Sequence, residues 1–326
     1  MLNGLFILLC LPTSIYYSEG DTYPILISSA MNLNLGFMMW YFTREHEKKI
    51  RQKDGYLIVT LGWLALSLGG SLPYILSGVI PEFTSAFFET VSGYTTTGSS
   101  VLNDIEGVHK GILLWRSLTQ WIGGMGIIVL TVAILPILGV GGMQLFMAES
   151  PGPSASKLHP RITETAKRLW IIYAIITLVE VFALKIAGMD WYDAVNHSFT
   201  TVSTGGFSTK NASVAYWNGF PLIKYIIPLF LFIAGANFLL IYFSLKGKIS
   251  KVFNNEEFKY YFFGIMGLTI IITFIIVNFQ DPYLVSTIEH PKPWGETENA
   301  FRHAAFQVTS ILTTTGFVTA DYTMWN

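Results

Sequence analysis

Seven apolar stretches of about membrane-spanning length dominate this sequence of 326 residues. About 20 apolar residues in a helix cross the ~30 Å hydrocarbon core of a bilayer. Only 13% of the residues are charged, against about 25% in an ordinary soluble domain. The sequence therefore predicts an all-α polytopic membrane protein. The predicted spans are Leu2 to Tyr17, Pro24 to Phe42, Tyr56 to Ile80, Gly111 to Leu138, Leu169 to Gly188, Gly219 to Leu245 and Tyr260 to Phe279.

The first stretch is short and lacks a basic leading region, so we favour a retained helix, with a cleaved signal peptide as the alternative. Its Cys10 is the single cysteine, so no internal disulfide is expected. The net charge of −1 carries no information on partners in such a chain. We expect a lipid bilayer around it and no nucleic acid.

Lysine and arginine concentrate in three alternate connecting segments, which hold 13 of the 20 basic residues. Basic loops face the cytoplasm, so we expect a cytoplasmic N-terminus. The basic residues in these segments are Arg44, Lys48, Lys49, Arg51, Lys53, Lys157, Arg161, Lys167, Arg168, Lys246, Lys248, Lys251 and Lys259.

Three short segments of threonine and glycine interrupt the apolar pattern, with Gly98, Gly205 and Gly316 spaced 107 and 111 residues apart. Irregular backbone at membrane depth survives only where protein or a water-filled cavity satisfies it. A repeated polar break therefore indicates an ion path lined by backbone. Ordinary turns are the alternative, and the near-equal spacing of three such segments disfavours it.

Each break follows a stretch that is too short to cross a membrane: Glu82 to Tyr94, Asp190 to Val202 and Glu298 to Leu312. We predict re-entrant half-helices that enter from the outer side. Two spans separate consecutive breaks, so the repeats share one direction. Parallel repeats favour a pore, whereas inverted repeats are typical of alternating-access carriers.

The glycines of the three breaks are expected to adopt positive φ and turn backbone carbonyls toward an ion, with hydroxyl or carbonyl contacts from Thr97, Thr204 and Thr315. The C-terminal ends of the half-helices would add partial negative charge. The candidate ion-binding residues are Thr96, Thr97, Gly98, Ser203, Thr204, Gly205, Thr314, Thr315 and Gly316.

Several motifs resemble those of the Trk/Ktr superfamily of potassium transporters, in particular the TrkH-type membrane subunit of bacterial Trk systems. Besides the three breaks, they are QWIGGMGIIVLTVAILPILGVGGMQLFMAESPGP at 120–153, PRITETAK at 160–167, and HSF at 197–199 leading into GGFST at 205–209. The resemblance runs from about Leu2 to the end of the chain.

The resemblance implies potassium uptake through four parallel repeats of helix, pore half-helix, filter and helix around a pseudo-fourfold pore. It also implies potassium as the metal at the filter residues, a homodimer, a bacterial cytoplasmic (inner) membrane, and gating by a cytosolic nucleotide-binding regulatory subunit (TrkA-like). The implied organisation is 1–54, two N-terminal transmembrane helices; 55–150, first repeat; 151–250, second repeat; and 251–326, third repeat without its second helix.

The chain departs from this pattern because it ends at Asn326, just past the third break. The fourth repeat, the third inner helix with its implied gate loop, and a basic residue near the pore are absent from it. We expect a longer protein.

Gly123, Gly124 and Gly126 are gating candidates in the first inner helix, with close helix packing as the default interpretation. The segment from Gly139 to Ala166 is expected to be a solvated connector or, by the resemblance, the docking site of the regulatory subunit.

For the buried polar candidates, ordinary structural roles compete with functional ones. Glu89 would attract cations, brace the filter or bond neighbouring backbone, and Asp190 and Asp193 would cap a helix. For Glu180 and Lys185 we favour a tertiary pair over a proton relay. Three further candidates would bond neighbouring groups, with pH sensing or ion contact as alternatives: His197, His303 and Asn237.

Other functional classes fit less well. The sequence has no metal-ligand spacing, nucleophile elbow or phosphate loop, so we expect no enzyme and no cofactor. A secondary carrier of another cation or small solute, and proton-coupled potassium symport, remain the alternatives.

Overall fold

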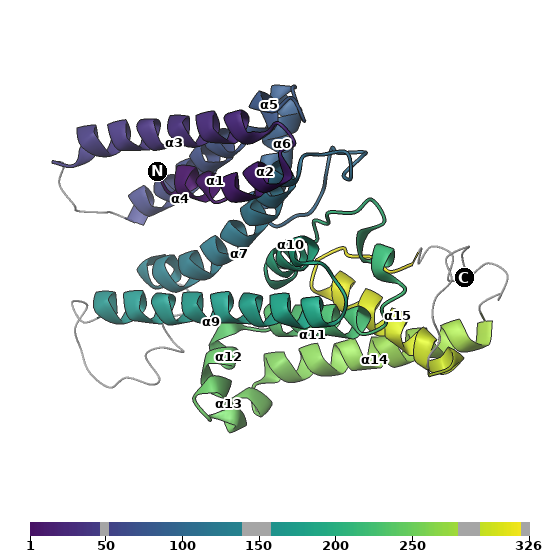
Figure 1. Cartoon of the computed structure of the whole chain (residues 1–326). Helices are drawn as coiled ribbons and strands as arrows, with labels where there is room; N and C mark the ends of the chain where they lie inside the picture. Colours follow the sequence, from purple (N-terminus) through teal and green to yellow (C-terminus); the bar gives the residue numbers. More distant parts are fainter. Residues whose placement is uncertain (46–51, 139–157, 280–293, 321–326) are drawn as a thin grey trace. The chain divides into compact units, whose positions relative to one another are not determined.

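The computed structural model describes residues 1–45, 52–138, 158–279 and 294–320, and this part of the chain is helical, without β-strands (Figure 1). The longer helices are α3 (Thr22–Thr43), α4 (Gln52–Gly70), α7 (Lys110–Leu138), α9 (Leu158–Ile186) and α14 (Glu256–Phe279). The shorter ones are α1 (Leu2–Leu8), α2 (Leu11–Tyr17), α5 (Leu72–Leu76), α6 (Phe83–Tyr94), α10 (Trp191–Val202), η2 (Ser213–Trp217), α11 (Ile223–Gly235), α12 (Phe238–Leu245), α13 (Ile249–Phe253) and α15 (Glu296–Leu312).

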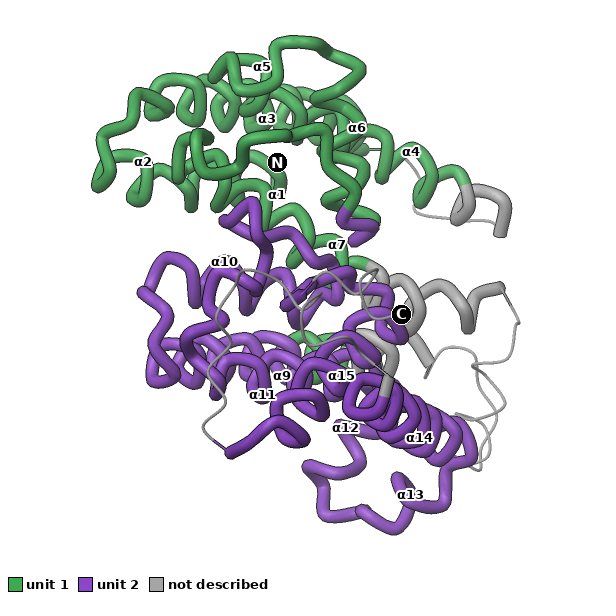
Figure 2. Tube along the Cα trace, turned by 90° about the vertical axis from the view of Figure 1, so that its right-hand side faces the viewer, with its two compact units in different colours: residues 1–95, 99–170 green, residues 96–98, 171–326 purple. Residues whose placement is uncertain are grey.

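The chain divides into two compact units, coloured separately in Figure 2. Unit 1 comprises residues 1–95 and 99–170, and unit 2 comprises residues 96–98 and 171–326. The short segment Thr96–Gly98 therefore groups with the second unit, although it follows a helix of the first.

Long apolar helices confirm the polytopic architecture. Four are long and apolar enough to cross a membrane: Thr22–Thr43, Leu57–Leu76, Ala166–Ile186 and Glu256–Asn278. They match the second, third, fifth and seventh predicted spans. The fourth predicted span corresponds to α7, which is 29 residues long.

Two predicted spans differ from the structure. The first divides into α1 and α2, because Pro12 has no amide hydrogen to bond the carbonyl four residues earlier. The sixth forms α11 and α12, which are bent by 101°. Ala236 is extended at this break, with φ −79° and ψ 155°.

Asn237 caps the new helix at this break, since its Oδ1 accepts a hydrogen bond from the Leu239 amide at 3.0 Å. The sequence assigned Asn237 to a continuous helix, with a contact to an ion or another helix. The expected continuous helix was wrong, because the chain turns at this residue and the side chain caps α12. Contact of Asn237 with an ion stays a prediction.

The three predicted half-helices are present as α6, α10 and α15. Each ends at the predicted residue: Tyr94, Val202 or Leu312. At the start of α10, Asp190 is the N-cap and accepts a hydrogen bond from the Asp193 amide at 2.8 Å.

A buried polar network joins helices α1, α3, α4 and α6 within unit 1. The Tyr94 hydroxyl donates to Asn3 Oδ1 at 2.5 Å, and Asn3 Nδ2 donates to Asn32 Oδ1 at 3.2 Å. Asn32 Nδ2 in turn donates to the Gly69 carbonyl at 3.0 Å. The N-terminal helices therefore contact the last residue of the first half-helix.

The core of unit 2 is apolar and draws on α9, α10, η2, α11 and α15. It includes the ring of Phe317, just after the third threonine-glycine segment. Its buried members are Val181, Leu184, Ala187, Met189, Ala194, Val214, Trp217, Ile223, Ile227, Leu231, Phe306 and Phe317.

Helix α14 presents many large apolar side chains outward. Tyr260 is 79% exposed, Phe263 67% and Phe274 61%. A surface this apolar is unfavourable in water and suits contact with lipid chains.

Candidate functional site

The three threonine-glycine segments share one backbone conformation. Each begins at the C-cap of a half-helix, at Thr95, Ser203 or Thr313. The next residue is a threonine in the left-handed region, and a glycine with positive φ follows two residues later. The φ values are 54° for Thr96, 52° for Thr204, 58° for Thr314, 79° for Gly98, 77° for Gly206 and 79° for Gly316.

This register corrects the sequence prediction for the second segment. We expected Gly205 to align with Gly98 and Gly316, but the positive-φ glycine there is Gly206. Gly205 instead aligns with Thr97 and Thr315. The sequence prediction aligned the first glycine of the adjacent pair, although counting from its own predicted half-helix ends, Tyr94, Val202 and Leu312, gives Gly206.

A left-handed conformation is unusual for a β-branched residue such as threonine and costs energy. Its recurrence at Thr96, Thr204 and Thr314 is a common structural feature of the three repeats. Backbone strain of this kind concentrates at functional sites, so the conformation supports a functional role for the segments.

The three segments meet within unit 2. A β-carbon placed on Gly98 would overlap the Gly205 carbonyl oxygen, and one on Gly206 would overlap the Thr315 carbonyl oxygen. Each glycine thus has both a positive φ and a neighbouring backbone in the space that a side chain would need. The contacts run in order from the first segment to the second and from the second to the third.

The third glycine differs from the other two. Among the residues that the structure describes, no heavy atom lies within 4 Å of a β-carbon placed on Gly316.

Backbone amides of these segments are bonded to the preceding half-helices. The Gly205 amide donates to the Thr200 carbonyl at 2.8 Å, and the Thr315 amide donates to the Ser310 carbonyl at 2.8 Å. With these donors engaged, the segments can offer carbonyl and hydroxyl oxygens. Oxygen ligands and the negative ends of the half-helices both favour a cation over an anion.

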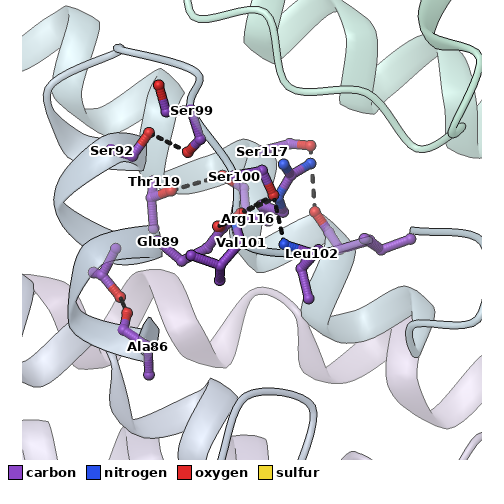
Figure 3. Close-up of polar contacts among 12 residues, drawn as sticks. Ala86, Glu89, Ser92, Ser99, Ser100, Val101, Leu102, Arg116, Ser117 and Thr119 are labelled. Atoms are coloured by element: carbon purple, nitrogen blue, oxygen red, sulfur yellow. Dashed lines mark hydrogen bonds and ion pairs between the residues drawn. The ribbon is translucent and has the colours of Figure 1, made fainter. Parts of the chain in front are cut away.

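Glu89 forms a buried polar centre within unit 1, together with Ser100, Val101 and Arg116 (Figure 3). Its carboxylate accepts hydrogen bonds from Ser100 Oγ at 2.9 Å and from the Val101 amide at 2.8 Å. Arg116 Nε donates to the same carboxylate at 2.7 Å. Both charged side chains are nearly inaccessible to solvent, at 0% for Glu89 and 3% for Arg116. Glu89 therefore bonds neighbouring backbone, one of the roles expected from sequence, and its bracing of the filter stays a prediction.

The gating candidates lie at close packing contacts of unit 1. A β-carbon on Gly123 would overlap the Tyr94 carbonyl oxygen, and one on Gly126 would lie 3.3 Å from the Trp63 ring. Gly124 is buried. This geometry supports the packing interpretation of Gly123, and a gating bend stays a prediction.

The expected pair between Glu180 and Lys185 is absent among the described residues. Glu180 is fully buried, and Lys185 Nζ lies 5.6 Å from the centre of the Trp191 ring.

In the described part of the chain, no cluster of three His, Cys, Asp or Glu residues could hold a metal ion. Residues 139–157 of the predicted docking loop lie outside the described residues, and 158–166 begin α9.

Comparison with protein families decides the relationship. The family model described as "TrkH: Cation transport protein" matches residues 24–326. The chain belongs to this TrkH family. Its membership and its apolar helices together make it a multi-pass membrane protein.

Individual relatives support the same family membership. The Trk system potassium uptake protein TrkH of Escherichia coli K12 is 41% identical over 315 residues, which cover 96% of this chain and 62% of that protein. TrkG of the same strain is 32% identical over 315 residues, with the same coverages of 96% and 62%. The crystal structure of the potassium transporter TrkH from Vibrio parahaemolyticus superimposes with a TM-score of 0.83 at 35% identity, covering 100% of this chain and 65% of that one. The chain thus spans less than two thirds of the length of these TrkH-family proteins.

Proposed function

We propose that this protein takes up potassium across the cytoplasmic membrane through a selectivity filter of backbone carbonyls. The observation that carries the proposal is the meeting of three repeated segments with one backbone conformation and a positive-φ glycine in each. Carbonyl oxygens at such a site replace the water that potassium loses on entry.

The proposed filter comprises Thr96–Gly98, Ser203–Gly206 and Thr314–Gly316. The carbonyls of Gly205 and Thr315 are the first candidates for ligands, because they lie at the junctions between segments. The ordered contacts between the segments and the family resemblance support a ring of four segments, with pseudo-fourfold symmetry. Potassium is the transported substrate here, and we propose no resident cofactor.

The placement in the membrane and the partners are also proposals. The basic connecting segments support a cytoplasmic N-terminus, and the family resemblance supports a bacterial inner membrane, a homodimer and a cytosolic nucleotide-binding regulatory subunit. Co-purification of such a subunit, lost when residues 139–157 are replaced by a neutral linker, is the expected result. Retention of the subunit would contradict docking at this loop.

Growth of bacteria that lack their own potassium uptake systems tests the function. The protein, expressed at its natural length, should restore growth at low potassium and potassium uptake by washed cells. A Gly206→Ala variant at equal abundance in the membrane is the matched control and should restore neither. Absence of growth and uptake with the unmodified protein present in the membrane would contradict the proposal.

A further inference from the structure

The register of the filter segments also aligns the residues on either side of them. Ser203 follows Thr95 by 108 positions, and Thr313 follows Ser203 by 110. Applied to the half-helices, these offsets define two equivalent positions, which we name the inner and outer brace positions. The inner position holds Glu89, His197 and Gln307, and the outer position holds Ser85, Asp193 and His303.

The chain after each filter glycine supplies the facing residues. By the same offsets, Ser100, Ser208 and Val318 are equivalent, and so are Val101, Thr209 and Thr319. In the first repeat, Glu89 bonds at both facing positions, because it accepts from the Ser100 hydroxyl and from the Val101 amide.

In the second repeat the inner position holds an imidazole in place of the carboxylate of Glu89. His197 Nδ1 lies 2.8 Å from the Asp193 carbonyl oxygen, and His197 Nε2 lies 3.0 Å from Ser208 Oγ. A carbonyl can only accept, so Nδ1 carries the proton and Nε2 accepts from the Ser208 hydroxyl. Ser208 Oγ in turn accepts from the Lys210 amide at 3.1 Å. With a neutral imidazole, each of these three hydrogen bonds has one donor and one acceptor.

The outer position is used in both the second and the third repeats. Thr209 Oγ1 donates to Asp193 Oδ1 at 2.6 Å. At the equivalent place, His303 Nδ1 lies 2.9 Å from Thr319 Oγ1. An aspartate and a histidine thus bond equivalent threonine hydroxyls, although the two half-helices share little sequence.

His197 also links the second repeat to the third within unit 2. Its ring centre lies 4.8 Å from that of Trp217 and 5.8 Å from that of Phe317. Phe317 directly follows Gly316, so His197 contacts the chain after two of the filter glycines. The side chain is fully buried, and its place is fixed by two hydrogen bonds and two rings.

We propose that Asp193, His197 and His303 are positioning residues that fix the chain behind the second and third filter segments and so maintain ion selectivity. The proposal rests on the filter function above. Ser208 lies two residues after Gly206, so loss of its hydrogen bond to His197 allows the backbone next to the Gly205 carbonyl to move. An ion site must be held to about 0.5 Å by its supporting residues, so a loosened segment discriminates less between potassium and sodium.

The chain itself provides the conservative replacements for a test. Gln307 occupies the inner position in the third repeat, so His197→Gln imports a group that can accept from Ser208. Asp193 occupies the outer position in the second repeat, so His303→Asp imports a carboxylate that can accept from Thr319. His197→Leu and His303→Leu remove the bonds at similar volume.

Potassium and sodium fluxes into vesicles that contain the protein at its natural length provide the readout. We expect each leucine variant to lower the ratio of potassium to sodium flux about tenfold, because the segment behind the filter carbonyls loses a buried hydrogen bond that positions it. The Gln and Asp variants should stay within about threefold of the unmodified ratio. Thr309→Val is the matched control, because among the described residues the buried Thr309 hydroxyl bonds within its own helix alone, to the Ala305 carbonyl at 2.7 Å.

The outcomes separate the two proposals. An unmodified protein without preference for potassium would overturn the filter function and this inference together. A selective protein whose leucine variants keep the ratio, or whose conservative variants lose as much as the leucine variants, would overturn the positioning role alone. If the leucine variants fail to fold, Ser208→Ala and Thr319→Val remove the same bonds from the opposite side, and unchanged ratios in both would also overturn it.

Discussion

Arg116 Nε donates to Glu89 Oε1 at 2.7 Å, and both side chains are buried within unit 1. Removing one partner of such a pair leaves an uncompensated charge. We expect Arg116→Ala to reduce stability by about 3–5 kcal/mol. Thermal unfolding of the purified protein in detergent measures the effect.

The control for this change is Arg168→Ala. Arg168 also pairs with a glutamate, Glu164, but the two side chains are 45% and 62% exposed. An exposed pair of this kind contributes about 0–1 kcal/mol. Equal losses of melting temperature in the two variants would contradict the structural role of the buried pair.

Gly206 and Gly205 should differ in their tolerance of a side chain. Gly206→Ala places a methyl group against the Thr315 carbonyl oxygen at φ 77°, where a left-handed alanine alone costs about 1–2 kcal/mol. Gly205 aligns with two threonines, so its backbone accepts a side chain in the other repeats. We expect Gly206→Ala to lower potassium uptake by at least about tenfold, the equivalent of 1.4 kcal/mol, and Gly205→Ala to lower it less. A larger loss of uptake in Gly205→Ala than in Gly206→Ala would instead support the alignment of Gly205 with Gly98 and Gly316 that the sequence predicts.

Tyr94→Phe removes the hydroxyl that donates to Asn3 at the end of the first half-helix. Because Asn3 Oδ1 would be left buried without this donor, we expect a loss of about 1–3 kcal/mol in stability. Tyr16→Phe is the control, since Tyr16 is 81% exposed. Melting curves of the two variants that coincide would exclude a stabilising role for the contact between the N-terminal helices and α6.

Asn237→Ala removes the cap at the break between α11 and α12. Loss of an N-cap side chain costs about 0.5–2 kcal/mol, so the melting temperature should fall. Asn34→Ala is a suitable comparison, because the exposed Asn34 amide donates to the Ala30 carbonyl of its own helix, at 2.8 Å, and to no other group in the described part of the chain. Equal melting temperatures of the Asn237 and Asn34 variants would show that the cap does not stabilise the protein and would contradict the prediction.

Features set by local sequence were predictable. The half-helices follow from their length and from the polar breaks behind them, and Asp190 caps α10 as an aspartate before an apolar run should. The spans follow from hydropathy. Their interruptions at Pro12 and Ala236 were missed: proline gave a signal for the first break, while the second depends on a backbone conformation that alanine does not indicate.

The contacts within the candidate site could not be predicted from the sequence. The predicted end of the second half-helix, Val202, already places Gly206 in register with Gly98 and Gly316, but the contacts that these glycines make could not be predicted from it. The brace positions hold different residues in each repeat, so no motif repeats there. Only the contacts of Asp193 with Thr209 and of His303 with Thr319 reveal that different side chains bond equivalent threonine hydroxyls.

Anomalous diffraction from crystals of the natural-length protein soaked in rubidium, which substitutes for potassium, tests the central claim most directly. The account predicts a rubidium peak in contact with the backbone carbonyl oxygens of Gly205 and Thr315 in the unmodified protein, and loss of that peak in Gly206→Ala. A peak bound only by side chains elsewhere, or no peak at these carbonyls in protein that transports rubidium, would contradict it.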